Sequence, residues 1–117
     1  MINYKPTLVA KLNELFNNAY PVVAEDFLTA STGLPAISYN LSNDLVRANG
    51  DDFGYSDVYY NIKVWGREIK AMEEIAVQID TMMRNLGFRR IATVELWFDG
   101  LGQKELRYQG LAREIFN

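Results

Sequence analysis

The sequence predicts an α+β fold in which two helices pack on one face of an antiparallel-rich, mixed β-sheet. Two kinds of hydrophobic spacing support this prediction. Two segments repeat apolar residues every three or four positions, as one face of a helix does. Four others alternate apolar and polar residues, as half-buried strands do. The predicted order is α-β-β-α-β-β, in which a helix between two strands allows one parallel pairing.

The first helix is expected over residues 4–18, with Pro6 tolerated in its first turn. The second helix is expected over residues 68–86, followed by Gly87 where a left-handed residue commonly ends a helix. One wide apolar stripe defines this second helix. Its members are Ile69, Met72, Ile75, Ala76, Ile79, Met82, Met83 and Leu86.

The first two strands are expected over residues 36–41 and 57–65, and residues 21–27 form a short extended piece. The segment 57–65 alternates most clearly. One of its faces carries Val58, Tyr60, Ile62 and Val64, and the other carries Tyr59, Asn61, Lys63 and Trp65. The second face is too apolar for open water, so either a helix or a partner covers it.

A closing hairpin is expected from residues 90–98 and 104–115. Asp99-Gly100 is a hairpin signal, in a loop of two residues or of four or more. On the first of these strands, Ala92, Val94, Leu96 and Phe98 oppose Ile91, Thr93, Glu95 and Trp97. The face with Trp97 is again expected to be covered by a helix or a partner.

Between the first two strands, residues 42–56 form a long polar loop, and loops of roughly this length tend to be functional or disordered. Acidic residues gather there, namely Asp44, Asp51, Asp52 and the adjacent Asp57. Their spacing does not match a calcium-binding EF-hand loop. A solvated acidic loop is therefore favoured over a cation site.

The composition limits the available chemistry, because the chain of 117 residues contains neither cysteine nor histidine. Thiol nucleophiles, Cys/His zinc sites and His-based acid–base schemes are excluded. Glu73-Glu74 is interpreted as a solvated helix face, and Gly100 to Gly102 as a turn rather than a phosphate loop. We expect no catalysis, no cofactor and no metal site.

The formal net charge of −3 argues against general nucleic-acid binding, which favours a basic surface. No apolar run approaches the length of a membrane span, and the first residues do not resemble a signal peptide.

Several stretches together resemble one family. They are LPAISY at 34–39, VYYNIKVW at 58–65, EEIA at 73–76 with ID at 79–80, LGFRR at 86–90, LRY at 106–108 and REI at 113–115. With the acidic loop between the first two, this succession resembles the tail terminator (tail completion) proteins of long-tailed, siphovirus-type bacteriophages and prophages. The resemblance runs from about residue 34 to the end of the chain and is weaker over the first helix.

The resemblance implies a single tail-terminator-like domain over residues 1–117. Such a protein is structural: it forms a ring, expected to be a hexamer, that caps the tail tube, ends its polymerisation and provides the surface for head–tail joining. The implied partners are other copies of the chain, the major tail tube protein and a head-completion or neck protein. DNA would pass through the ring without sequence-specific recognition. The implied location is the head-proximal end of the virion tail, and the bacterial host cytoplasm during assembly.

The resemblance also implies that the long loop faces the ring lumen or a neighbouring subunit. Together with the aromatic residues of the strands, the loop supplies the candidate protein-interaction residues. These are Asp44, Arg47, Asp51, Asp52, Phe53, Tyr55, Tyr59, Trp65 and Trp97. Two other functions stay open: a head-side neck protein of the head-closure or adaptor type, and a small ligand-binding regulatory α+β domain.

Overall fold

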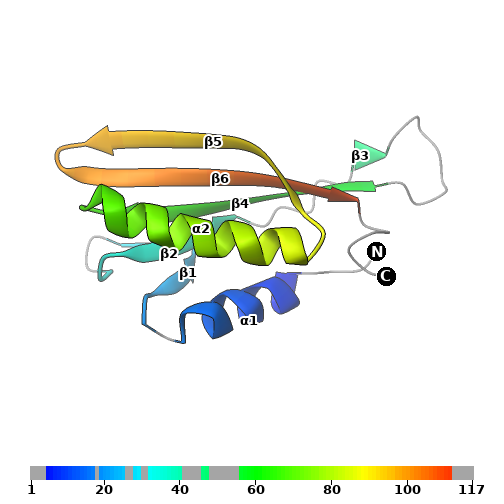
Figure 1. The fold of residues 1–117 in the computed structure, drawn as a ribbon, viewed down its shortest axis with the longest axis horizontal. Coiled ribbons are helices and arrows are strands. Elements are labelled where there is room, and N and C mark those ends of the chain that lie inside the picture. Colours follow the sequence, from blue (N-terminus) through cyan, green and yellow to red (C-terminus); the bar gives the residue numbers. More distant parts are fainter. Residues whose placement is uncertain are drawn as a thin grey trace.

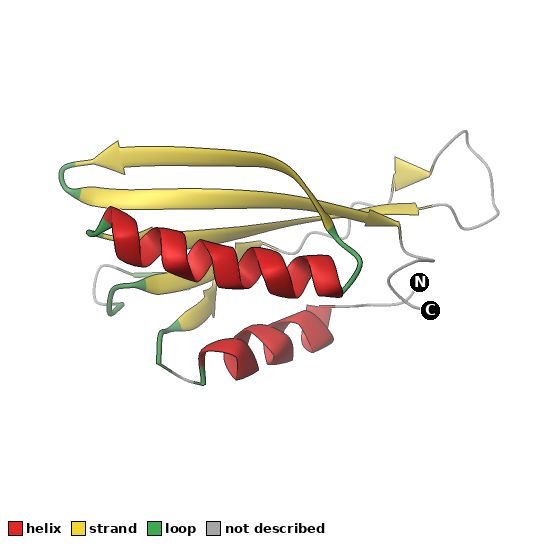
Figure 2. Cartoon of the chain, in the orientation of Figure 1, coloured by secondary structure: helices red, strands yellow, loops and turns green. Residues whose placement is uncertain are grey.

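The computed structural model describes residues 5–17, 19–25, 28–29, 32–40, 46–47 and 56–111. These residues form two helices, α1 (Lys5–Phe16) and α2 (Ile69–Asn85), packed on one face of a mixed sheet (Figure 1, Figure 2). The strands are β1 (Val22–Ala24), β2 (Ala36–Asn40), β3 (Val46–Arg47), β4 (Ser56–Gly66), β5 (Arg89–Phe98) and β6 (Leu101–Leu111). The predicted α+β fold is confirmed.

The strand order in the sheet is β1-β2-β4-β6-β5, with β3 paired to β4. Only β1 and β2 run parallel as neighbours among the described strands. The helix α2 connects β4 to β5, which have the same direction but are separated by β6. The parallel pair therefore lies elsewhere than between the two strands that flank α2.

Two strands were not predicted as separate elements. The extended piece at 21–27 contains β1, whose neighbour Pro21 accepts a hydrogen bond from the Ile37 backbone N–H at 2.8 Å. The loop at 42–56 contains β3, where Val46 and Arg47 lie opposite Asp57 and Ser56. The strand β4 begins at Ser56, one residue earlier than expected.

The ends of the helices agree closely with the sequence pattern. Asn17 adopts a left-handed φ of 47° directly after α1. At the end of α2, Gly87 has a φ of 97°, and the Phe88 backbone N–H donates to the Met83 carbonyl at 2.9 Å. This is the left-handed cap that Gly87 predicts.

The core lies between the two helices and one face of the sheet. Fully or almost fully buried side chains come from α1, α2 and the central strands. They are Leu8, Leu12, Phe16, Ile37, Tyr60, Ile62, Val64, Met72, Ile75, Ala76, Ile79, Met83, Phe88, Leu106 and Tyr108. The predicted stripe of α2 faces this core except at its first member, Ile69, which is exposed. In the described part of the chain, neither helix has the length and apolar character needed to cross a bilayer.

Candidate interaction surface

The strand β5 forms one edge of the sheet, with β6 as its neighbour (Figure 1). None of its ten residues is buried. The opposite edge, β1, is only three residues long, and all three are half-buried. The molecule therefore has one short, sheltered edge and one long, exposed edge.

The register of the hairpin determines which side chains of β5 face the helices. Thr93 lies opposite Leu106, which belongs to the core, and Glu95 lies opposite Lys104. Because directly opposed residues share a face of an antiparallel pair, Thr93, Glu95 and Trp97 lie on the helix side. A bulge between Arg90 and Ala92 shifts the register at the start of the strand.

The apolar row of β5 consequently lies on the face away from the helices. Its members are Ala92, Val94, Leu96 and Phe98. Leu96 is 57% exposed and Phe98 is 85% exposed, whereas Ala92 and Val94 are half-buried. From the sequence, we expected the face of this strand with Trp97 to be covered by a helix or a partner. In the structure, Leu96 and Phe98, which are more exposed than Trp97, lie on the opposite face.

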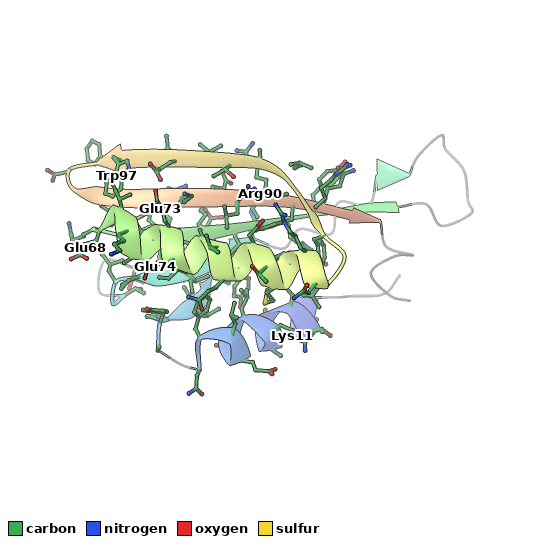
Figure 3. The ribbon with its side chains drawn as sticks, viewed as in Figure 1. Lys11, Glu68, Glu73, Glu74, Arg90 and Trp97 are labelled. Atoms are coloured by element: carbon green, nitrogen blue, oxygen red, sulfur yellow. The ribbon has the colours of Figure 1, made fainter. Side chains whose placement is uncertain are left out.

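Trp97 is positioned by the facing glycine. A Cβ atom placed on Gly102 would lie 2.6 Å from the Trp97 ring, so only glycine leaves room for the indole. The indole Nε1 donates to Glu95 Oε2 at 3.3 Å. Trp97 remains 40% exposed at the hairpin end of β5, and Arg90 lies at the opposite end (Figure 3).

Tyr59 and Trp65 lie on the face of the sheet away from the helices, and both are half-buried. Trp65 Nε1 donates to Ser38 Oγ at 2.8 Å, and Gln109 Nε2 donates to the Tyr59 hydroxyl at 3.4 Å. These contacts hold both rings within the sheet surface. The three predicted aromatic residues that the structure describes therefore do not share one surface, because Trp97 faces the helix side.

The predicted loop residues are mostly outside the described part of the chain. Arg47 lies in β3, opposite Ser56 of β4. The others, Asp44, Asp51, Asp52, Phe53 and Tyr55, fall outside the described residues. Leu96 and Phe98 are exposed apolar residues that the sequence prediction did not include.

The polar cluster around Asp80 joins three elements of the fold. The Tyr108 hydroxyl donates to Asp80 Oδ1 at 3.0 Å, and Arg84 Nε lies 2.9 Å from Asp80 Oδ2. Arg90 approaches the same carboxylate at 3.8 Å. Burial, and then the charge of Asp80, raises the pKa of Tyr108 well above its usual range. The cluster fastens α2 to β5 and β6, and it opposes deprotonation of Tyr108 at alkaline pH.

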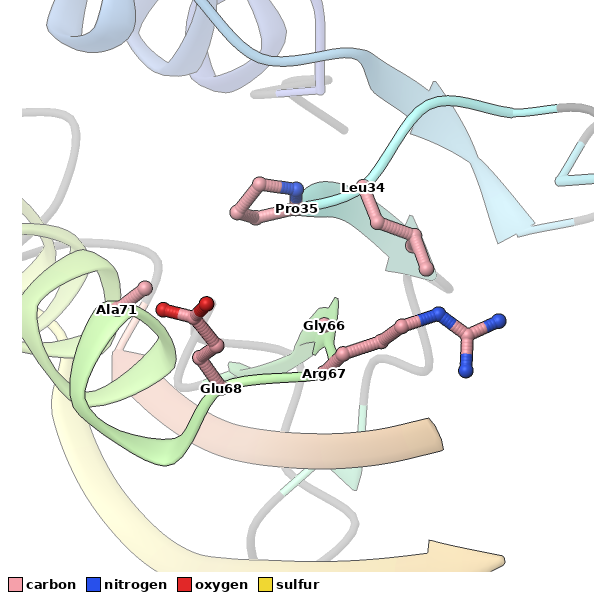
Figure 4. A pocket seen from close by; sticks show the side chains of 6 residues that line it. All are labelled: Leu34, Pro35, Gly66, Arg67, Glu68 and Ala71. Carbon is pink, nitrogen blue, oxygen red and sulfur yellow. The ribbon is translucent and has the colours of Figure 1, made fainter. Parts of the chain in front are cut away.

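The described surface includes two hollows of different character. The first, of about 250 Å³, lies between the end of β4 and the start of α2. It is lined by Leu34, Pro35, Gly66, Arg67, Glu68 and Ala71, and the charged groups of Arg67 and Glu68 lie apart rather than converging (Figure 4). The second is a groove of about 440 Å³ between α1 and α2, with Val77 on its lining. Within the described residues, no three acidic side chains gather to form a metal site.

Compared with protein-family models and with curated proteins, the chain matches none. The resemblance to tail terminators therefore stays a prediction.

Proposed function

We propose that this chain is a structural protein of a phage virion that assembles into a ring, expected to be a hexamer, on the end of the tail tube. The ring ends polymerisation of the tube and offers the surface to which the head joins. The resemblance of residues from about 34 onward to tail terminators supports this proposal. So does the presence of exposed apolar side chains on two unlike surfaces of the chain.

The two unlike surfaces are the observation on which the proposal rests. One is the hairpin end of β5, where Trp97 and Phe98 are exposed on opposite faces of the strand, and the other is the helical surface around Val77, which is 66% exposed. A head-to-tail ring needs two different patches on each subunit, so that one patch meets the other on the next copy. A subunit with unlike apolar patches fits that requirement.

The partners follow from this role. They are other copies of the chain, the major tail tube protein and a head-completion or neck protein, with DNA passing through the ring. The protein would act at the head-proximal end of the tail, after assembly in the cytoplasm of the bacterial host. No catalytic step is part of this proposal.

Negative-stain microscopy of the purified protein, alone and mixed with tail tubes of the same phage, tests the proposal. We expect rings with a central hole, or caps on tube ends. Val77→Lys should reduce the number of rings, because it places a charge in an apolar contact. Thr7→Lys, at an exposed position of α1, is the matched control and should leave rings unchanged.

A protein that never forms rings and never binds tube ends would contradict the proposal. Binding to head-side neck proteins without binding to tubes would instead favour a head-closure or adaptor role. Pull-downs with tube protein and with neck protein separate these two results.

A further inference from the structure

The exposed edge of β5 has the properties of a strand that pairs with another strand. An edge strand presents a row of backbone N–H and C=O groups that can continue the sheet. Natural edges are usually shortened, covered or interrupted by proline. The strand β5 spans Arg89–Phe98 without proline, and in the described part of the chain it pairs only with β6.

The charges along β5 indicate what would occupy this edge. Arg89 and Arg90 stand at its start, whereas Glu95 and Asp99 lie near and just beyond its end. If a second copy approaches antiparallel, the basic end of each strand meets the acidic end of the other. A parallel approach would bring like charges together. The strand is therefore complementary to itself in one orientation.

We propose that two copies of this chain pair through their β5 edges in antiparallel orientation, with a two-fold axis beside Val94. The two sheets then form one continuous sheet across the dimer. Both copies keep their helices on the same side, because the axis runs perpendicular to the sheet.

The side chains fit this arrangement. With the axis beside Val94, each Ala92 lies opposite Leu96 of the other copy, and the two Val94 residues lie opposite each other. These three residues share the face away from the helices, so apolar side chains meet apolar ones and cover the exposed Leu96. On the other face, Thr93 lies opposite Glu95. The bulge between Arg90 and Ala92 interrupts the regular register beyond this point, and there the basic start of one strand lies beside the acidic end of the other.

The charged residues of β5 can take part in this pairing while they keep their contacts within the chain. Arg89 donates to the neutral side chain of Gln109 at 3.3 Å, which does not neutralise its charge. Glu95 and Lys104 are 3.9 Å apart, at the outer limit of an ion pair. Arg90 already lies 3.8 Å from Asp80, so Arg89 is the basic residue that would meet the acidic end of a second copy.

This contact differs in symmetry from the proposed ring, although both use the hairpin end of β5. A two-fold contact closes after two copies, whereas a ring needs a head-to-tail contact between unlike patches. The dimer can be tested in solution without any phage component. A chain that forms rings on tail tubes but stays monomeric in solution would contradict this inference alone. A dimer that never caps tubes would contradict the tail-capping proposal alone.

Sedimentation velocity of the full chain over a range of concentrations measures the association. We expect a monomer–dimer equilibrium that weakens as salt is added, because the end charges contribute to it. Leu96→Lys should raise the dissociation constant by about tenfold or more, since it places a charge in the apolar contact. Val77→Lys makes the same kind of change at an exposed apolar position of α2 and should leave the dimer intact.

Cross-linking tests the orientation, because the chain contains no cysteine of its own. Val94→Cys should form a disulfide-linked dimer on mild oxidation, whereas Val77→Cys should not. A mixture of Arg89→Cys and Asp99→Cys chains should link to each other more readily than either chain links to itself. Circular dichroism of each variant checks that its fold is retained.

Three results would overturn the inference. One is a chain that stays monomeric at every concentration. Another is a dimer that cross-links through Val77→Cys but not through Val94→Cys, which would place the contact on the helices. The third is preferential self-linking of Arg89→Cys, which would show a parallel contact.

Discussion

The strands β4 and β5 carry similar alternating patterns but occupy very different environments. In β4, Tyr60, Ile62 and Val64 are buried against the helices. In β5, Leu96 and Phe98 point away from the helices and are exposed. Alternation gives the period of a strand, but the face that becomes buried depends on how the strand is paired.

Position in the sheet explains the difference. The strand β4 has β2 on one side and β6 on the other, and α2 packs across it. The strand β5 has one described neighbour and lies at the margin of the helical layer (Figure 2). The central strands therefore stabilise the single chain, whereas the large apolar residues Leu96 and Phe98 of β5 stay exposed in it.

The largest expected effect comes from making the same substitution on both sides of this comparison. Leu106→Ala, in the fully buried row that faces the helices, should lower the free energy of unfolding by about 3 kcal/mol. Leu96→Ala should lower it by less than about 0.5 kcal/mol, because the side chain is already exposed in the monomer. Urea unfolding at low protein concentration measures both changes on the monomer.

Equal losses for the two leucine variants would contradict the comparison. They would show that Leu96 is packed within the single chain as tightly as Leu106. The strand β5 and the central strands would then stabilise the fold of the single chain to a similar extent.

The local elements of the fold could be predicted from the sequence. The stripe of α2, the cap at Gly87 and the alternation of β4 depend on neighbouring residues, and all three are confirmed, apart from the exposed Ile69 at the start of the stripe. The parallel pairing of β1 with β2 could not be predicted, because it depends on contacts between segments more than ten residues apart. The short strand β3 has only two residues and no alternation to reveal it.

The orientation of β5 was the main feature missed at the candidate site. The turn has only two residues, Asp99 and Gly100, with left-handed φ angles of 53° and 79°. A two-residue Asp-Gly turn sets Phe98 opposite Leu101, and counting back sets Thr93 opposite Leu106. A two-residue turn, rather than a loop of four or more residues, places Leu96 and Phe98 on the face away from the helices. The loop residues of the candidate site stay a prediction.

A second pair of variants compares close packing in the two regions. A Cβ on Gly66 would lie 2.9 Å from Met72 Cγ, in the buried core, so Gly66→Ala should lower the free energy of unfolding by about 2 kcal/mol. Gly102→Ala displaces the partly exposed ring of Trp97, which can swing into solvent, and should cost less than about 1 kcal/mol. Urea unfolding gives both values, and tryptophan fluorescence should change on Gly102→Ala. A larger loss for Gly102→Ala would reverse the expected order.

The contact between Tyr108 and Asp80 gives a pH-dependent test of the central region. Tyr108→Phe removes one hydrogen bond and should lower the free energy of unfolding by about 1 kcal/mol at neutral pH. Because the pKa of Tyr108 is raised in the folded chain, only the unfolded chain loses this proton as the pH rises above about 10. The wild type should therefore lose stability there by up to about 1.4 kcal/mol per pH unit more than the variant does.

Unfolding curves at a series of alkaline pH values measure this difference. The separation between wild type and Tyr108→Phe should shrink as the pH rises. A separation that stays constant across the alkaline range would show that Tyr108 releases its proton equally easily in both states.

The smallest effect is expected at the hairpin end of β5. Glu95→Gln removes the charge that faces Lys104 at 3.9 Å but keeps an oxygen that can accept from Trp97. Partly exposed ion pairs contribute little, so the free energy of unfolding of the monomer should fall by less than about 0.5 kcal/mol. Urea unfolding at low and high salt checks this value. A loss above about 1 kcal/mol would mean that this end of β5 stabilises the single chain, and it would weaken the argument that its side chains are available for contact with a second copy.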